Sequence, residues 1–230
     1  MEHEVVTRDA WLAARKELLA REKDFTRLRD ELSRRRRELP WQPVEKEYVF
    51  EGANGRRTLS ELFDGRTQLV VYHFMFAPEW DEGCKSCSFW ADNFDPNVIH
   101  LKARDVTMVA VSRAPYGKLA AYRERMGWNF PWYSSAETDF NVDYGVTFAP
   151  EDQERDGAYN YGSLVAGGPE REGVSVFYRD GGGRVFHTYS TYARGIDLLN
   201  AAYNYLDLVP KGRDEEGERS QSWVRRHDEY

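Results

Sequence analysis

The sequence predicts an α/β protein in which a mixed sheet carries helices on both faces. From residue 44 onward, short apolar segments typical of strands alternate with amphipathic segments typical of helices. Two of the strand segments, 68–76 and 106–112, are almost continuously apolar, as is typical of strands buried on both faces. The chain has 230 residues, of which 41% are hydrophobic, enough for one domain with a real core.

The charge balance and the hydropathy argue against two classes of partner. There are 39 acidic and 32 basic side chains, a net charge of −7, whereas non-specific nucleic-acid binding needs clustered cations. No segment approaches the ~20 apolar residues of a membrane-spanning helix. The first ten residues lack the basic and apolar regions of a secretory signal. We therefore expect a cytoplasmic protein with no nucleic-acid and no membrane partner.

Residues 1–40 are predicted to form a helical extension, with one long helix over 7–38. The run 34–37 is all arginine and would lie in the last turn, where cations favour the helix dipole. Apolar side chains recur at seven-residue steps, at Trp11, Leu18, Phe25 and Leu32. This stripe must be covered by the body of the protein or by a second copy. A homodimer through this helix and the C-terminal tail is one arrangement that the sequence allows.

The body of the protein is predicted over residues 41–210. Its expected elements in chain order are a strand at 44–50, a helical turn at 58–63, a strand at 68–76, a helix at 88–100 broken near Pro96, a strand at 106–112 and a helix at 115–126. Residues 128–172 have little pattern and are expected to be an insertion with long loops. A hairpin of strands at 174–178 and 185–189 and a helix at 196–208 follow. Residues 211–230 would be a tail packed on the body or on a partner copy.

Two cysteines, Cys84 and Cys87, lie between a predicted buried strand and a predicted helix. In this position a Cys-x-x-Cys motif indicates redox chemistry, because the spacing brings both sulfurs close enough for a disulfide. The free N–H groups at the helix start would stabilise a thiolate at the first cysteine. We expect Cys84 to be the attacking thiolate and Cys87 the resolving thiol.

The charges around the pair act in opposite directions. The acids Glu79, Asp81 and Glu82 would raise the pKa of Cys84, whereas Lys85 and the helix start would lower it. The sequence leaves the balance open.

Four segments carry a family resemblance: LFDGR, LVVYHFMF, the W-x-x-G-C-x-x-C block and the ending WVRRHDEY. They resemble the bacterial family of domain of unknown function 899, over nearly the whole chain. This resemblance implies a thioredoxin-like fold, with a mixed sheet flanked by helices, a long N-terminal helix and a C-terminal tail. Family members are labelled predicted dithiol-disulfide oxidoreductases.

The resemblance implies that Cys84 and Cys87 are catalytic, and that Trp80, Lys85 and Gly173 contact the substrate. Two positions depart from related patterns. Thioredoxins carry a cis-proline before the strand that faces the cysteine pair, where this chain has Gly173. Peroxiredoxins carry Thr or Ser three residues before the reactive cysteine, where this chain has Asp81. A peroxidase site of that type is not supported.

The leading hypothesis is a thiol-disulfide oxidoreductase that acts on a thiol or disulfide substrate or on a partner reductant. No cofactor is expected, because the Gly-rich segment 181–183 joins two strands and does not open a helix. One alternative is a zinc or copper site in which the cysteines are joined by His73, His187, His227 or Asp228. The other is a non-redox thioredoxin fold that binds a small hydrophobic ligand or dimerises.

Overall fold

The computed structural model describes residues 3–215 and 220–230; residues 216–219 of the predicted tail lie outside them. The chain divides into two compact units, Met1–Pro40 and Trp41–Tyr230.

The N-terminal unit contains one long helix, α1 (Arg8–Arg37), as the sequence predicts. The Thr7 hydroxyl caps it by accepting a hydrogen bond from the Ala10 N–H at 3.3 Å. The arginine run in its last turn is partly neutralised, because Arg34 and Arg35 both pair with Glu31. None of the helix residues is buried.

The second unit is built on a mixed sheet in which eight strands have the order β1-β8-β7-β4-β5-β6-β2-β3. Strands β4, β5 and β6 are parallel, and β7 runs antiparallel to both β4 and β8. The strands are β1 (Gln42–Pro43), β2 (Val49–Gly52), β3 (Gly55–Thr58), β4 (Gln68–His73), β5 (Val106–Ser112), β6 (Trp132–Ser134), β7 (Gly173–Arg179) and β8 (Val185–Tyr192).

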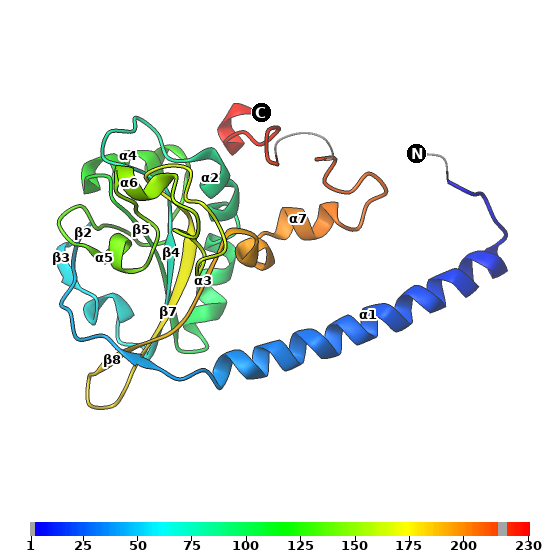
Figure 1. The fold of residues 1–230 in the computed structure, drawn as a ribbon, viewed down its shortest axis with the longest axis horizontal. Coiled ribbons are helices and arrows are strands. Elements are labelled where there is room, and N and C mark those ends of the chain that lie inside the picture. The colour runs from blue at the N-terminus through cyan, green and yellow to red at the C-terminus, as the bar shows by residue number, and fades with distance from the viewer. Residues whose placement is uncertain (1–2, 216–219) are drawn as a thin grey trace. The chain divides into compact units, whose positions relative to one another are not determined.

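Both faces of the sheet are covered, as the apolar runs of β4 and β5 predict (Figure 1). Along β4, Tyr72 belongs to one hydrophobic cluster, whereas Leu69 and Val71 belong to the other. The Tyr72 face packs against α2 (Lys85–Ala91), α3 (Asp95–Lys102), α4 (Tyr116–Arg125) and α7 (Ala201–Leu206). The opposite face packs against the 3-10 helix η1 (Glu61–Phe63) and α5 (Phe140–Asp143).

The predicted insertion at 128–172 differs from the structure at its start. Its first residues form β6, which pairs with β5 from Ala110 to Ser112 and contributes the buried Trp132. A three-residue strand is too short to show an alternating pattern, so only the pairing reveals it. The rest of the segment contains α5, the short helix α6 (Pro150–Gln153) and loops around the small apolar cluster of Val146 and Tyr159.

Two other predicted elements have different bounds in the structure. The strand expected at 44–50 begins only at Val49, and Lys46 forms ion pairs with Asp139 and Asp143 instead of joining a ladder. The helix expected at 196–208 is divided into the 3-10 helix η2 (Ala193–Leu199) and α7, which the Asn200 side chain caps. Among the described residues, no helix is long and apolar enough to cross a membrane.

Candidate active site

The cysteine pair lies where the chain passes from the end of β4 to the start of α2. Cys84 is the residue before the first turn of α2, and its carbonyl accepts a hydrogen bond from the Ser88 N–H at 3.0 Å. Cys84 is half-buried, whereas Cys87, one turn along, is only 2% exposed. Both are free thiols. The Cys84 side chain is therefore the more accessible of the two, and Cys87 is covered.

The two thiols differ in acidity because their surroundings differ. The pKa of Cys84 is lowered to about 7 by a hydrogen bond from the Cys87 thiol, helped by the backbone N–H groups of Cys87 and Ser86. Burial raises the pKa of Cys87 well above its ordinary value. Only Cys84 is thus available as a thiolate near neutral pH.

The structure identifies the acid that opposes ionisation of the pair. Glu82, one of the acids expected to do so, is instead paired with Arg125 and Arg226. The carboxylate that raises the pKa of both cysteines is that of Glu172, from the segment just before β7. The start of β7 reaches the pair because β7 is antiparallel to β4, with Gly173 opposite His73.

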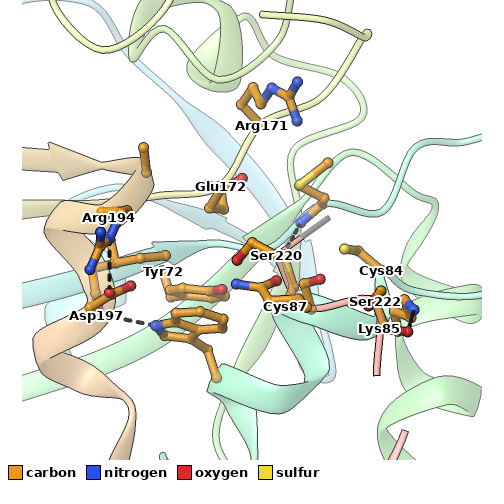
Figure 2. A pocket seen from close by; sticks show the side chains of 16 residues that line it. Tyr72, Cys84, Lys85, Cys87, Arg171, Glu172, Arg194, Asp197, Ser220 and Ser222 are labelled. Atoms are coloured by element: carbon orange, nitrogen blue, oxygen red, sulfur yellow. Dashed lines mark hydrogen bonds and ion pairs between the residues drawn. The ribbon is translucent and has the colours of Figure 1, made fainter. Parts of the chain in front are cut away.

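A cavity of about 670 Å³ opens beside the pair. Figure 2 shows Cys84, Cys87 and Lys85 on one side of it, with Arg171 and Glu172 across from them. Its walls come from the end of β4, the start of α2, the segment before β7, η2 and the tail. The residues that line it include Tyr72, Lys85, Arg171, Glu172, Arg194, Asp197 and Ser222.

Tyr72 lies at the inner end of this cavity. Its side chain is fully buried, and its hydroxyl has no hydrogen-bond partner among the described residues. Burial, together with the neighbouring Cys87, raises the pKa of the phenol well above its ordinary value, so it stays a donor. A buried hydroxyl without an oxygen or nitrogen partner is costly to the fold, and here the Cys87 thiol is its polar neighbour.

The tail packs beside the start of α2. The Arg226 guanidinium donates to the Gly83 carbonyl at 2.9 Å and to the Tyr122 hydroxyl at 2.8 Å. Farther along, Asp228 pairs with Arg125 at 2.7 Å. The Lys85 ammonium reaches the Ser222 carbonyl at 3.4 Å. The tail therefore holds the loop that carries Cys84 and forms one wall of the cavity.

The sequence-predicted substrate contacts are only partly gathered at the cavity. Lys85 lines it, but Trp80 and Gly173 do not. Trp80 is half-buried against the apolar cluster under α2, and its carbonyl accepts from Lys118 at 2.9 Å. At Gly173 an added Cβ would lie 2.6 Å from the Tyr192 ring, so packing alone accounts for glycine there.

The side chains considered for a metal site are not brought to the cysteine pair. His73 contacts Ser175 at 2.8 Å, and His187 contacts Ser190 at 2.7 Å. His227 pairs with Asp92 at 2.7 Å, and Asp228 is held by Arg125. Over residues 3–215 and 220–230, no group of three or more His, Cys, Asp or Glu side chains has the arrangement of a metal site.

Sequence reasoning missed Tyr72, Arg171 and Glu172 as residues of the site. Tyr72 was part of an apolar strand, and nothing in the sequence shows that its hydroxyl lacks a partner. The other two could be found from the topology, because the start of an antiparallel neighbour strand lies beside the end of β4.

The fold and site together define a thioredoxin-like protein. Its parallel strands β4 and β5, the antiparallel hairpin β7–β8 beside them, and the Cys-x-x-Cys motif that opens the helix after β4 carry this assignment. The chain belongs to the family described as bacterial protein of unknown function, DUF899, which matches residues 1–230. None of the curated proteins compared with the chain matches it.

Several solved structures are similar to this chain at low sequence identity. Peroxidoxin BcpB from Mycobacterium tuberculosis has a TM-score of 0.47 and 18% identity, over 71% of this chain and 94% of that one. A C84S mutant of peroxiredoxin Q from Xanthomonas campestris has a TM-score of 0.46 and 15% identity, over 71% and 98%. A putative thiol:disulfide interchange protein DsbE from Chlorobium tepidum has a TM-score of 0.42 and 16% identity, over 71% and 97%.

Proposed function

We propose that the chain is a thiol-disulfide oxidoreductase. The observation that carries this proposal is the difference between the two cysteines. Cys84 is half-buried at the start of α2 and has a lowered pKa, whereas Cys87, one turn along, is buried. Both lie beside an open cavity. This is the arrangement that an attacking thiolate and a resolving thiol require.

The reaction proceeds in two exchanges. The Cys84 thiolate attacks one sulfur of a disulfide RSSR, forms a mixed disulfide and releases RS⁻. Cys87 then loses its proton and attacks the Cys84 sulfur, which closes the Cys84–Cys87 disulfide and releases the second RS⁻. Two electrons pass from the pair to the substrate, and a dithiol reductant must return them to start the next cycle.

We further propose that the protein works in a reducing compartment such as the cytoplasm, where such a reductant keeps the pair as thiols.

We also propose that α1 pairs with α1 of a second copy. The supporting observation is its exposed apolar stripe, since side chains repeated every seven residues form the seam of a coiled coil; Trp11, Leu18, Phe25 and Leu32 are 58%, 55%, 65% and 44% exposed.

Disulfide exchange by single-cysteine variants of the full chain tests the proposal. Cys84→Ser is expected to abolish reduction of hydroxyethyl disulfide, because the nucleophile is gone. Cys87→Ser is expected to stop after the first exchange and to accumulate a mixed disulfide at Cys84, visible by intact mass. The double variant supplies the background rate. Wild-type activity no faster than this background would refute the proposal and favour a non-redox ligand-binding protein.

A further inference from the structure

We infer that the cavity beside the cysteine pair takes a small disulfide that carries a carboxylate, rather than an extended peptide. This inference rests on the proposed function and adds the class of substrate to it. Four features of the cavity support it: the pairing of β7 on both edges, the size of the cavity, the Arg171 guanidinium and the buried Tyr72 hydroxyl.

The backbone beside the cavity offers no free strand edge. An extended peptide docks by adding main-chain hydrogen bonds to such an edge. Here Gly173 is paired in the sheet on both sides, opposite His73 and Tyr192. Each of the two preceding residues has one backbone group bonded: the Glu172 carbonyl accepts from the Tyr159 hydroxyl at 2.6 Å, and the Arg171 N–H donates to the Val146 carbonyl at 2.8 Å.

The size of the cavity fits a small molecule. Its volume of about 670 Å³ lies within the roughly 300–1,000 Å³ typical of small-molecule sites. Residues of the tail, among them Ser222, form one of its walls and limit its extent along the surface. A ligand bound here meets side chains from five separate segments.

Three cations line the cavity, Lys85, Arg171 and Arg194, and among the described residues only Arg194 forms an ion pair. Arg194 pairs with Asp197 at 3.4 Å, and the Lys85 ammonium donates to the Ser222 carbonyl. The Arg171 guanidinium forms no ion pair and no side-chain hydrogen bond with any residue in 3–215 or 220–230. A planar guanidinium binds a carboxylate through two parallel hydrogen bonds, so the matching group on a ligand is a carboxylate.

The Arg171 guanidinium lies close to the loop at Gly167. A Cβ at Gly167 would lie 2.7 Å from its Nη2 atom, so the loop passes directly against the guanidinium. Figure 2 shows the guanidinium and the Glu172 side chain on the same side of the cavity. The Glu172 carboxylate acts to raise the pKa of both Cys84 and Cys87.

The inner end of the cavity supplies the second, independent sign of a ligand. The Tyr72 hydroxyl is buried beside the Cys87 thiol and has no oxygen or nitrogen partner among the described residues. When a small disulfide is attacked by Cys84, its departing sulfur carries negative charge and can accept this hydrogen bond. The carboxylate at Arg171 and the sulfur at Tyr72 would then orient the ligand across the pair. The overall reaction is RSSR plus two protein thiols giving two RSH and the Cys84–Cys87 disulfide.

Three small disulfides that differ in charge test the inference: dithiodipropionate with two carboxylates, neutral hydroxyethyl disulfide and cationic cystamine. We expect kcat/KM to be highest for the dianion and lowest for the dication. Arg171→Gln should lower kcat/KM for dithiodipropionate about tenfold, the loss of one charge-assisted hydrogen-bonded pair, and leave the neutral disulfide unchanged. Arg155→Gln is the matched control, because its charge is paired with Asp152 and it does not line the cavity, and it should retain the preference.

The outcomes of this experiment distinguish the inferred substrate class from the proposed oxidoreductase function. Equal kcat/KM for all three disulfides, or an equal loss on all three in Arg171→Gln, would overturn the inference and leave the oxidoreductase intact. Reduction of a protein disulfide such as that of insulin with a higher kcat/KM than dithiodipropionate would also overturn it. If none of the disulfides is reduced above the double-cysteine variant, the proposed function itself fails.

Discussion

At the scale of single residues, the start of α2 lowers the pKa of Cys84. Cys84 precedes the first turn, where the N–H groups of Ser86 and Cys87 are free to stabilise an anion. Cys87 donates to it and is itself kept protonated by burial. The same pair of side chains thus supplies both a thiolate and the donor that stabilises it.

The rate of Cys84 alkylation should therefore depend on pH around neutrality. The thiolate fraction rises as pH increases through the pKa of about 7, so the iodoacetamide rate should level off above that value. Peptide mapping would assign the label to Cys84, and the Cys84→Ser variant reports how slowly buried Cys87 reacts. An inflection near the ordinary cysteine pKa of about 8.5 would contradict the assignment of Cys84 as the activated thiol.

Tyr72→Phe separates function from stability at the inner end of the cavity. The hydroxyl has no oxygen or nitrogen partner among residues 3–215 and 220–230, so its removal should leave the melting temperature unchanged or raise it. Because the departing sulfur would lose a hydrogen bond, kcat for disulfide reduction should fall by roughly two- to tenfold. Calorimetry and steady-state kinetics on one preparation measure both. A lower melting temperature with unchanged kcat would show a structural role instead.

At the scale of elements, the tail stabilises the loop that carries Cys84. Arg226 is mostly buried and satisfies the Gly83 carbonyl, the Tyr122 hydroxyl and the Glu82 carboxylate at once. Gly83 itself is constrained, because an added Cβ would lie 2.8 Å from the Phe74 ring and 2.9 Å from the Tyr122 ring. The approach to the pair is therefore fixed from both the core and the tail.

Arg226→Ala should destabilise the protein by about 1–3 kcal/mol, because it leaves the Gly83 carbonyl without that donor. For a domain of this size the melting temperature should fall by roughly 2–4 °C for each kcal/mol. Arg225→Ala is the matched control, since that neighbouring residue is exposed. Thermal unfolding of both variants measures the difference. Equal melting temperatures would show that the tail does not hold the loop.

The elements that sequence reasoning predicted well have strong local patterns. The apolar runs of β4 and β5, the hairpin β7–β8 and the long α1 all occupy the predicted places. By contrast, β6 depends on pairing with β5, and the division of the 196–208 helix depends on the Asn200 cap. At the site, Cys84, Cys87 and Lys85 follow from the motif. The partners Arg171 and Glu172 lie more than 80 positions away, so only the sheet register brings them there.

At the scale of the whole molecule, α1 is a helix with an apolar stripe and no buried residue. Large exposed apolar surface is uncommon in a protein that stays monomeric, and heptad spacing favours pairing with an identical helix. The proposed dimer would bury this stripe while each copy retains its own cysteine pair.

Substitution of both Leu18 and Phe25 by glutamate should convert the proposed dimer into a monomer, because charge at the seam resists burial. Sedimentation equilibrium measures the mass, and the rate of disulfide reduction should stay unchanged. Lys23→Glu changes charge on the same helix away from the heptad positions and serves as control. A wild-type chain that sediments as a monomer would refute the dimer.

Redox titration of the full chain tests the central claim most directly. The reduced protein is equilibrated with mixtures of reduced and oxidised dithiothreitol, quenched with acid, and its free thiols are counted by mass after alkylation. We predict one reversible two-electron transition that consumes both thiols and joins Cys84 to Cys87 within one chain. Thiols that stay free at every ratio, or a disulfide formed only between chains, would contradict the account.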